Sequence, residues 1–149
     1  MIEEDADFQD DGEDNTIKLT DEFKKDLMEE KCECCAMVDV LSFFKNDEKK
    51  GLKDFENDTV KQTKEYLNTF NRYGVNPSNA SEIPFTLRKI LDIKKGIFSQ
   101  IELSLLLDLS PTTAEEAFNL IPSLKKKLKA EEMNEYLSKL DKKNKNVYN

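Results

Sequence analysis

Apolar residues recur every three or four positions along most of this 149-residue chain, which is the period of an amphipathic helix. Thr20, followed by two acidic residues, is suited to cap a helix at its N-terminus. The apolar stripe after it consists of Phe23, Leu27, Cys34, Val38 and Leu41. These signals predict one helix that begins after Thr20 and runs to about Phe44 or Lys45.

A second helix is expected after a charged linker, residues 46–57, which Gly51 interrupts. Either Asn57 or Asp58 can cap this helix. Gly74 is a suitable end, because glycine readily adopts the left-handed conformation that closes many helices. The apolar positions of the second helix are Val60, Tyr66, Leu67, Phe70 and Tyr73.

Helix signals become denser from Ser81 onward, after a polar turn at residues 76–80. One helix is predicted over 82–95, with Pro84 near its start and Gly96 past its end. The further signals are a capping box at Ser99–Glu102, another at Thr112–Glu115 with a helix to Pro122, and a helix from about Ala130. Short helices with brief connections predict a compact helical bundle over residues 81–141.

One segment departs from the helical period. Thr16–Thr20 alternates in polarity, so Ile17 and Leu19 would share one face of a strand. No second strand pattern occurs, and a lone strand is unstable unless a sheet edge elsewhere accepts it. The segment is either a plain extended linker or a strand that a partner's sheet completes. The predicted fold class is all-α, with an N-terminal strand and helical arm followed by a small bundle.

Charge is unevenly distributed along the chain. The net charge is −8, yet residues 1–30 hold 13 acidic residues and 3 lysines, or −10, which leaves about +2 for the remaining 119 residues. Residues 1–15 cannot bury enough apolar area to offset their ordering entropy, so we expect a disordered acidic tail. Lysines gather at residues 125–129 and in a basic tail, 142–149. Such clusters form solvated surface or attract phosphate weakly and without sequence preference.

Patterns for catalysis and metal binding are missing from the sequence. The chain has no histidine and only four glycines, too few for a glycine-rich phosphate loop. Cys32, Cys34 and Cys35 lack the histidine that commonly completes a zinc site, and they are too close together to form a disulfide framework. We therefore expect a binding protein with no catalytic residues, no cofactor, no metal and no disulfide.

Membrane and targeting signals are also missing. No stretch approaches the roughly 20 apolar residues that a membrane span needs. The acidic N-terminus fits neither a signal peptide nor a transit peptide. We expect a soluble, intracellular protein that makes no membrane contact.

Two stretches are more specific than periodicity. Residues 63–73 place three aromatic residues and an arginine towards one helix end, and residues 110–117 lead into Ile-Pro-Ser-Leu at 121–124. Together they resemble the fourth subunit of eukaryotic RNA polymerase II, a family that has a counterpart in the archaeal RNA polymerase. The resemblance covers roughly residues 23–140, and the Cys-Glu-Cys-Cys cluster departs from the family's pattern.

The resemblance implies a non-catalytic, nuclear stalk subunit. Its bundle would be similar to the HRDC fold of RecQ-type helicases. Residues 16–75 would wrap the OB-fold-bearing seventh subunit, and the pair would dock on the polymerase core. The residues expected to bind the partner are Ile17, Leu19, Phe23, Val38, Leu41, Tyr66, Phe70 and Tyr73. Nascent RNA would meet mainly the partner, with modest help from Lys125, Lys126, Lys127 and Lys129.

Alternatives stay open at this point. The bundle could bind nucleic acid independently, which predicts a basic stripe interleaved with exposed aromatics. The aromatics at 66–73 and the lysines at 125–129 lie in different segments of an acidic chain, which favours an interaction subunit. The equivalent stalk subunit of RNA polymerase III is a second alternative, which the Ile-Pro-Ser-Leu run disfavours. Each aromatic residue could also pack between the two N-terminal helices instead of meeting a partner.

Overall fold

The computed structural model describes residues 19–49 and 57–144, and within them the chain is built from helices. They contain no strand; a single antiparallel bridge joins Tyr73 to Asn144. The helices are α2 (Asp21–Met28), α3 (Met37–Lys49), α4 (Asp58–Phe70), α5 (Ile83–Ile90), α6 (Gln100–Leu109), α7 (Ala114–Leu120) and α8 (Ala130–Asp141), with 3₁₀ segments η1 (Ile93–Lys95) and η2 (Pro122–Lys126). The expected all-α class is confirmed.

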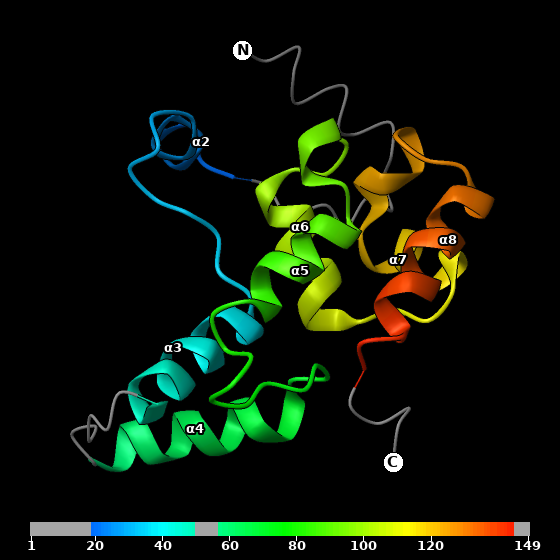
Figure 1. Ribbon diagram of the computed structural model, residues 1–149. Helices are drawn as coiled ribbons and strands as arrows, with labels where there is room; N and C mark the ends of the chain where they lie inside the picture. Colours follow the sequence, from blue (N-terminus) through cyan, green and yellow to red (C-terminus); the bar gives the residue numbers. More distant parts are fainter. Residues whose placement is uncertain (1–18, 50–56, 145–149) are drawn as a thin grey trace.

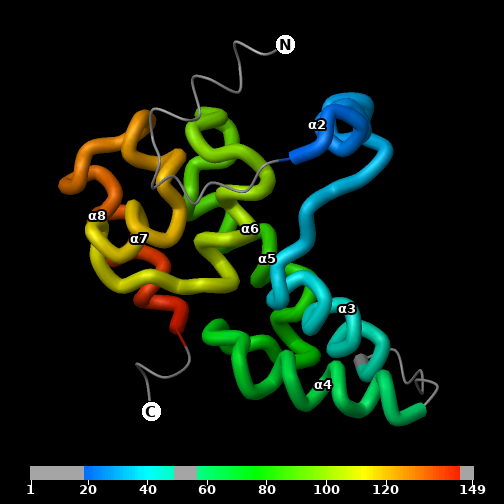
Figure 2. The backbone as a smooth tube through the Cα atoms, turned by 180° about the vertical axis from the view of Figure 1, so that it is seen from behind, coloured from blue at the N-terminus to red at the C-terminus, as the bar shows by residue number. Residues whose placement is uncertain are grey.

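The helices fall into three groups in space (Figure 1). Helices α5 to α8 pack into a bundle. Helices α3 and α4 form an antiparallel pair that projects from the bundle, and α2 stands apart at the end of a long extended segment. The view from behind shows the same separation of α2 from the other helices (Figure 2).

One continuous apolar core links the bundle to the base of α3. The most completely buried side chains of the bundle are Leu87, Leu91, Leu106, Leu124 and Met133. Ala36, Val38 and Tyr73, which precede the bundle in sequence, belong to the same cluster. Burying a side chain of this size contributes about 1.5–3 kcal/mol. The α3–α4 pair is therefore attached by packing as well as by the chain itself.

The single long helix expected after Thr20 is wrong. The chain forms α2 and α3 with non-helical residues 29–36 between them. Thr20 does cap α2, since its hydroxyl accepts the N–H of Phe23 at 3.2 Å. The helix ends beside Glu30, whose φ of 57° lies in the left-handed region that non-glycine residues enter at a cost. The cysteine cluster thus lies on an extended segment and not on a helical stripe.

The other boundaries follow the sequence signals with local differences, but the capping box expected at Thr112–Glu115 is not formed. Thr113 instead caps α7, where its hydroxyl accepts the N–H of Glu116 at 3.1 Å. Helix α4 is capped by Asn57, one of the two caps that the sequence offered, but it ends at Phe70, before Gly74. The helix predicted over 82–95 is divided at Asp92, whose φ is 50°, into α5 and η1. The Ser99–Glu102 capping box is formed, and α8 begins at Ala130.

Candidate partner-binding surface

Helix α2 lacks cover from the rest of the described chain. None of its eight residues is buried, and Met28 is 85% exposed and Phe23 37%. Both backbone views show it away from the other helices (Figures 1 and 2). A helix of this length is marginal in water without tertiary packing. Its apolar side chains therefore need contacts that these residues do not supply.

Both flanks of α2 are attached at the start of α6. On one side, Leu19 lines a groove together with Ile101. On the other side, the backbone N–H of Cys34 donates to Oε1 of Gln100 at 3.0 Å. Residues 19–36, here called the α2 arm, therefore project from the bundle but are held at their base.

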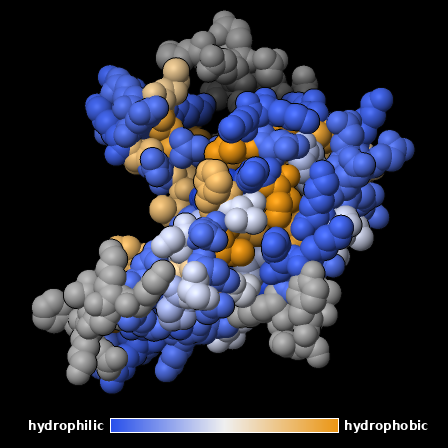
Figure 3. Space-filling view, viewed as in Figure 1, coloured by the Kyte–Doolittle hydropathy of each residue, from blue (hydrophilic) through white to orange (hydrophobic). Residues whose placement is uncertain are grey.

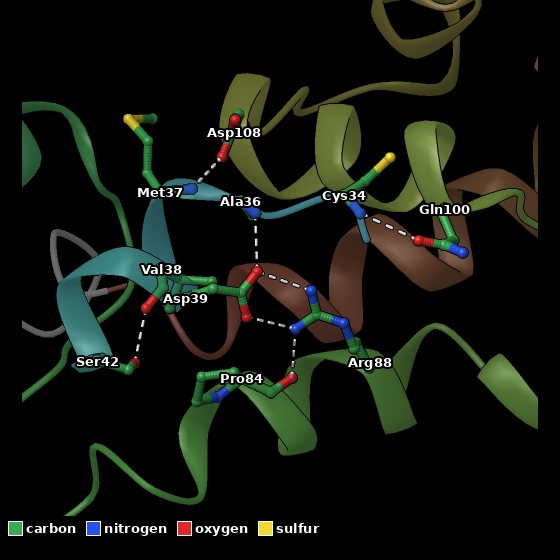
Figure 4. Close-up of polar contacts among 10 residues, drawn as sticks. All are labelled: Cys34, Ala36, Met37, Val38, Asp39, Ser42, Pro84, Arg88, Gln100 and Asp108. Carbon is green, nitrogen blue, oxygen red and sulfur yellow. Dashed lines mark hydrogen bonds and ion pairs between the residues drawn. The ribbon is translucent and has the colours of Figure 1, made fainter. Parts of the chain in front are cut away.

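A bidentate ion pair fixes the junction between the α2 arm and α3 (Figure 4). The guanidinium of Arg88 donates to both carboxylate oxygens of Asp39, at 2.7 Å each, and these bonds raise the pKa of Arg88. Oδ2 of Asp39 also accepts the N–H of Ala36 at 2.7 Å, while Asp108 of α6 accepts that of Met37 at 2.7 Å. These carboxylates satisfy N–H groups at the start of α3, where no capping side chain precedes the helix.

The α3–α4 pair exposes large aromatic side chains. Phe43 is 63% exposed, Tyr66 57% and Phe70 54%. The rings of Tyr66 and Phe70, one helical turn apart, have centroids 4.6 Å apart at an interplanar angle of 43°. Exposed aromatic clusters of this kind are enriched where proteins bind one another. The α3–α4 helix pair is therefore a second candidate contact surface, separate from α2.

Three of the residues expected to bind a partner are buried within the chain. Val38, Leu41 and Tyr73 are 1%, 3% and 2% exposed. Val38 and Tyr73 belong to the core cluster that holds α3 and the segment after α4 to the bundle. Their side chains stabilise this chain's own packing. They are therefore not available on the described surface for direct contact with a partner.

The other expected contacts lie on separate elements. Tyr66 and Phe70 come together on α4, whereas Phe23 lies on α2. Leu19 is half-buried in the groove described above, and Ile17 lies outside the described residues. Figure 3 shows apolar residues gathered over the middle of one face, beside the segment that joins α2 to α3, with hydrophilic residues around them.

The four candidate lysines differ in their surroundings. Lys127 pairs with Glu102, a carboxylate only 4% exposed that also accepts the Ser123 hydroxyl at 2.5 Å. Burial by itself raises the pKa of Glu102, but Lys127, Ser123 and the Ser99 N–H outweigh it and hold that pKa below its ordinary value. Lys127 therefore has a structural role. The other three lysines, Lys125, Lys126 and Lys129, are exposed and are here called the basic edge.

The described residues contain no group of three or more His, Cys, Asp or Glu placed to hold a metal ion. Cys32 and Cys34 are half-buried and Cys35 is exposed, all with free thiols. Burial, followed by the neighbouring cysteines, raises the pKa of Cys34, which disfavours the reactive thiolate. The lack of a metal or disulfide in the purified protein stays a prediction. None of the helices described here is long and apolar enough to cross a membrane.

The residues that fix the α2 arm were not found by sequence reasoning. Asp39 and Arg88 are 49 positions apart, and Gln100 meets a residue 66 positions before it. No local pattern reports such pairings. The one available signal was an acidic residue inside an apolar helical run, at Asp39 and at Asp108. Such residues are rarely buried without a partner.

Comparison with models of known families matches the chain to RNA polymerase Rpb4 over residues 11–144. A search of curated proteins finds no match. The matched span includes the α2 arm, the α3–α4 pair and the bundle, so it covers every surface described above. Members of the family associate with the RNA polymerase core and with a stalk partner. The chain therefore belongs to the RNA polymerase Rpb4 family, the non-catalytic stalk subunits of RNA polymerase.

Proposed function

We propose that this chain is the stalk subunit of RNA polymerase II in the nucleus. It pairs with the OB-fold-bearing seventh subunit, and the pair docks on the polymerase core to support initiation and the handling of nascent RNA. Family membership supports the stalk role. The Thr-Ala-Glu-Glu-Ala run at 113–117 and Ile-Pro-Ser-Leu at 121–124 support the polymerase II form over that of polymerase III.

The observation that carries the proposal is the uncovered α2. It has no buried residue, and Met28 is 85% exposed. Association with a second subunit would bury these apolar side chains and supply the tertiary contacts that so short a helix needs. The aromatic pair on α4 would provide further contact area.

We assign the affinity for the partner to residues 16–74 and treat residues 81–141 as an HRDC-like bundle. Within the first part, Phe23, Tyr66 and Phe70 are the direct contacts, whereas Val38, Leu41 and Tyr73 support them from inside. Thr16–Thr20 adds as an edge strand to the partner's sheet. A proline at Lys18 would then weaken assembly, provided that the lost amide faces the partner. A complex in which Ile17 and Leu19 make no main-chain bonds to the partner would contradict the strand.

Any RNA contact by this chain is secondary to that of the partner's OB fold. The exposed lysines of the basic edge form a short stretch without interleaved aromatic side chains. They supply charge without the stacking surface that single-stranded RNA uses. Their contribution is a modest, salt-sensitive attraction.

The test is affinity for the seventh subunit, measured by calorimetry on full-length variants. Phe23→Ala and Met28→Ala remove α2 contacts, and Tyr66→Ala and Phe70→Ala remove α4 contacts. Phe85→Ala is a matched control, because Phe85 is 68% exposed but belongs to the bundle. Truncating an aromatic at a desolvated interface costs about 2 kcal/mol or more, against less than about 1 kcal/mol at its rim.

The controls decide between the outcomes. Losses at α2 and α4 with little effect of Phe85→Ala would support the proposal. The reverse pattern would place the interface on the bundle and contradict it. Comparing the polymerase II partner with its polymerase III equivalent in the same assay tests the choice of polymerase.

A further inference from the structure

A groove of about 230 Å³ lies between the start of α6 and the junction of α7 with η2. Its apolar lining comes from Ile101, Leu105, Leu120, Ile121 and Pro122, and Leu19 of the α2 arm also lines it. Leu120 stays 44% exposed. The groove therefore holds one apolar residue of the N-terminal region and has room for more.

Next in sequence to one side of the groove lies positive charge. Lys127 lines it, held by Glu102. Lys125 and Lys126 precede Lys127 in η2, and Lys129 follows just beyond. The basic edge therefore directly flanks a residue that lines the groove.

The sequence that precedes Leu19 complements both features. Residues 1–18 contain 8 acidic residues, all between Glu3 and Asp14, and one lysine, Lys18. Ile17 stands two positions before Leu19, so it would face the same side in an extended segment. In the sequence, the apolar residues Ile17 and Leu19 follow a strongly acidic stretch. In the structure, the apolar groove adjoins the basic edge, so the two match in both polarity and charge.

We propose that the groove is the docking site of the chain's own N-terminal segment. Ile17 enters the groove next to Leu19, and the acidic residues 3–14 lie over the basic edge. Each exposed ion pair is weak. Because the tail is tethered at Leu19, however, its effective concentration at the lysines is high, on the order of millimolar. As long as the chain is unpaired, the docked tail keeps RNA away from the basic edge.

The docked state has a consequence for assembly. Strand addition by Thr16–Thr20, as proposed above, uses the same residues, so groove docking and strand addition exclude each other. Pairing with the stalk partner would release the tail and uncover the basic edge. This consequence rests on the proposed function, whereas docking itself is tested on the unpaired full-length chain.

The direct test is zero-length cross-linking of carboxylates to lysines at low salt, read by mass spectrometry. Mixing unlabelled and ¹⁵N-labelled copies separates links within one chain from links between chains. We expect links from residues 3–14 to Lys125, Lys126 or Lys129 within one chain, lost at 1 M salt, where screening is strong. Links only between chains, or none to these lysines, would overturn the proposal.

A second test separates docking from general charge effects. The readout is the affinity of the full-length chain for a fluorescent 20-nucleotide oligouridine at low salt. Leu120→Asp adds a negative charge, which by simple repulsion would weaken RNA binding. By displacing the N-terminal segment from the groove it should instead tighten binding, by about tenfold given the tail's high effective concentration. The matched control is Leu109→Asp, since Leu109 is also on the surface, at 41% exposed, but outside the groove.

The lysines supply the remaining control. In the Leu120→Asp background, Lys125→Glu with Lys126→Glu should abolish the gain. Lys142→Glu with Lys143→Glu, the same charge change at another exposed site, should leave most of it. Weaker RNA binding by Leu120→Asp, or equal losses from the two lysine pairs, would overturn the proposal.

Discussion

At the scale of single residues, Asp39 joins three parts of the molecule. Its carboxylate binds Arg88 of α5 in bidentate fashion and accepts the N–H of Ala36 at the start of its own helix. The side chains of Asp39 and Arg88 are only 19% and 22% exposed. Bidentate, partly buried pairs of this kind are stronger than surface ion pairs. They are also costly to break, because the remaining charge loses its partner.

We predict that Asp39→Ala lowers the free energy of unfolding by about 2–3 kcal/mol, because it leaves Arg88 and the Ala36 N–H unpaired. Urea denaturation of the full-length chain measures this. Lys31→Ala is the control, since its pair with Glu29 spans the same 2.7 Å but the Lys31 side chain is 61% exposed, so its loss should cost less than about 0.5 kcal/mol. Equal losses for the two variants would contradict the role assigned to Asp39.

Glu102 makes stability depend on pH. Its folded pKa is lowered, so its contribution is complete above the unfolded value of 4.5 and is lost as pH falls through the folded pKa. We predict that Glu102→Gln destabilises the protein by about 1–2 kcal/mol at pH 7. The gap from wild type should shrink as the pH falls below 4.5. Thermal unfolding from pH 7 to pH 3 would refute this if the gap stayed constant.

At the scale of elements, α2 and α6 represent opposite cases. Helix α6 has a complete Ser99–Glu102 capping box and buries Leu103, Leu106 and Leu107. Helix α2 has a good N-cap but no buried residue. Because most helical stability in proteins comes from packing, a cap alone does not hold α2.

We predict that the amides of α2 exchange with solvent far faster than those of α6 in the unpaired chain, and become protected on partner binding. The reason is that α2 has no buried residue, so its local opening exposes little apolar surface. Hydrogen exchange with mass spectrometry measures both states, and α6 serves as the internal reference. Protection of α2 equal to that of α6 in the unpaired chain would show that the helix needs no partner.

At the scale of the whole molecule, the N-terminal part and the bundle share one core. Ala36, Val38 and Tyr73 are buried in the cluster formed by the bundle. The N-terminal part and the bundle therefore fold together, and the proposal assigns only partner binding, not folding, to the N-terminal part. A deletion that ends at residue 75 removes partner contacts and core side chains together, so point variants at exposed residues test binding more cleanly.

We predict that residues 76–149 alone fold into a helical bundle less stable than the full-length chain by about 3 kcal/mol or more. The loss of buried Val38 and Tyr73 exposes apolar surface and opens the core. Circular dichroism with urea denaturation of both proteins measures the difference. Equal stability would mean that the bundle does not depend on the packing of α3, and an unfolded fragment would contradict its independence.

The sequence determined the elements that rest on local physics. The caps at Thr20, Asn57 and Ser99 and the dense helices of the bundle depend on hydrogen bonds and apolar spacing within a few residues. The sequence also carried the family resemblance. The expected surface contacts were less well determined, because a stripe of Val38, Leu41 and Tyr73 looks the same whether a partner or the chain's own core covers it.

Tertiary structure alone decided the break between α2 and α3. The apolar stripe skips one turn between Leu27 and Cys34 but then resumes at helical spacing, so the pattern alone did not show a break. In the structure, the N–H groups of Cys34 and Met37 bond to Gln100 and Asp108 of α6, 66 and 71 positions away. Those distant acceptors satisfy the backbone where the helix is interrupted, and local propensity cannot report them. Packing against the bundle likewise buries Tyr73 and leaves Tyr66 exposed, although both lie in the stripe that predicted one helix.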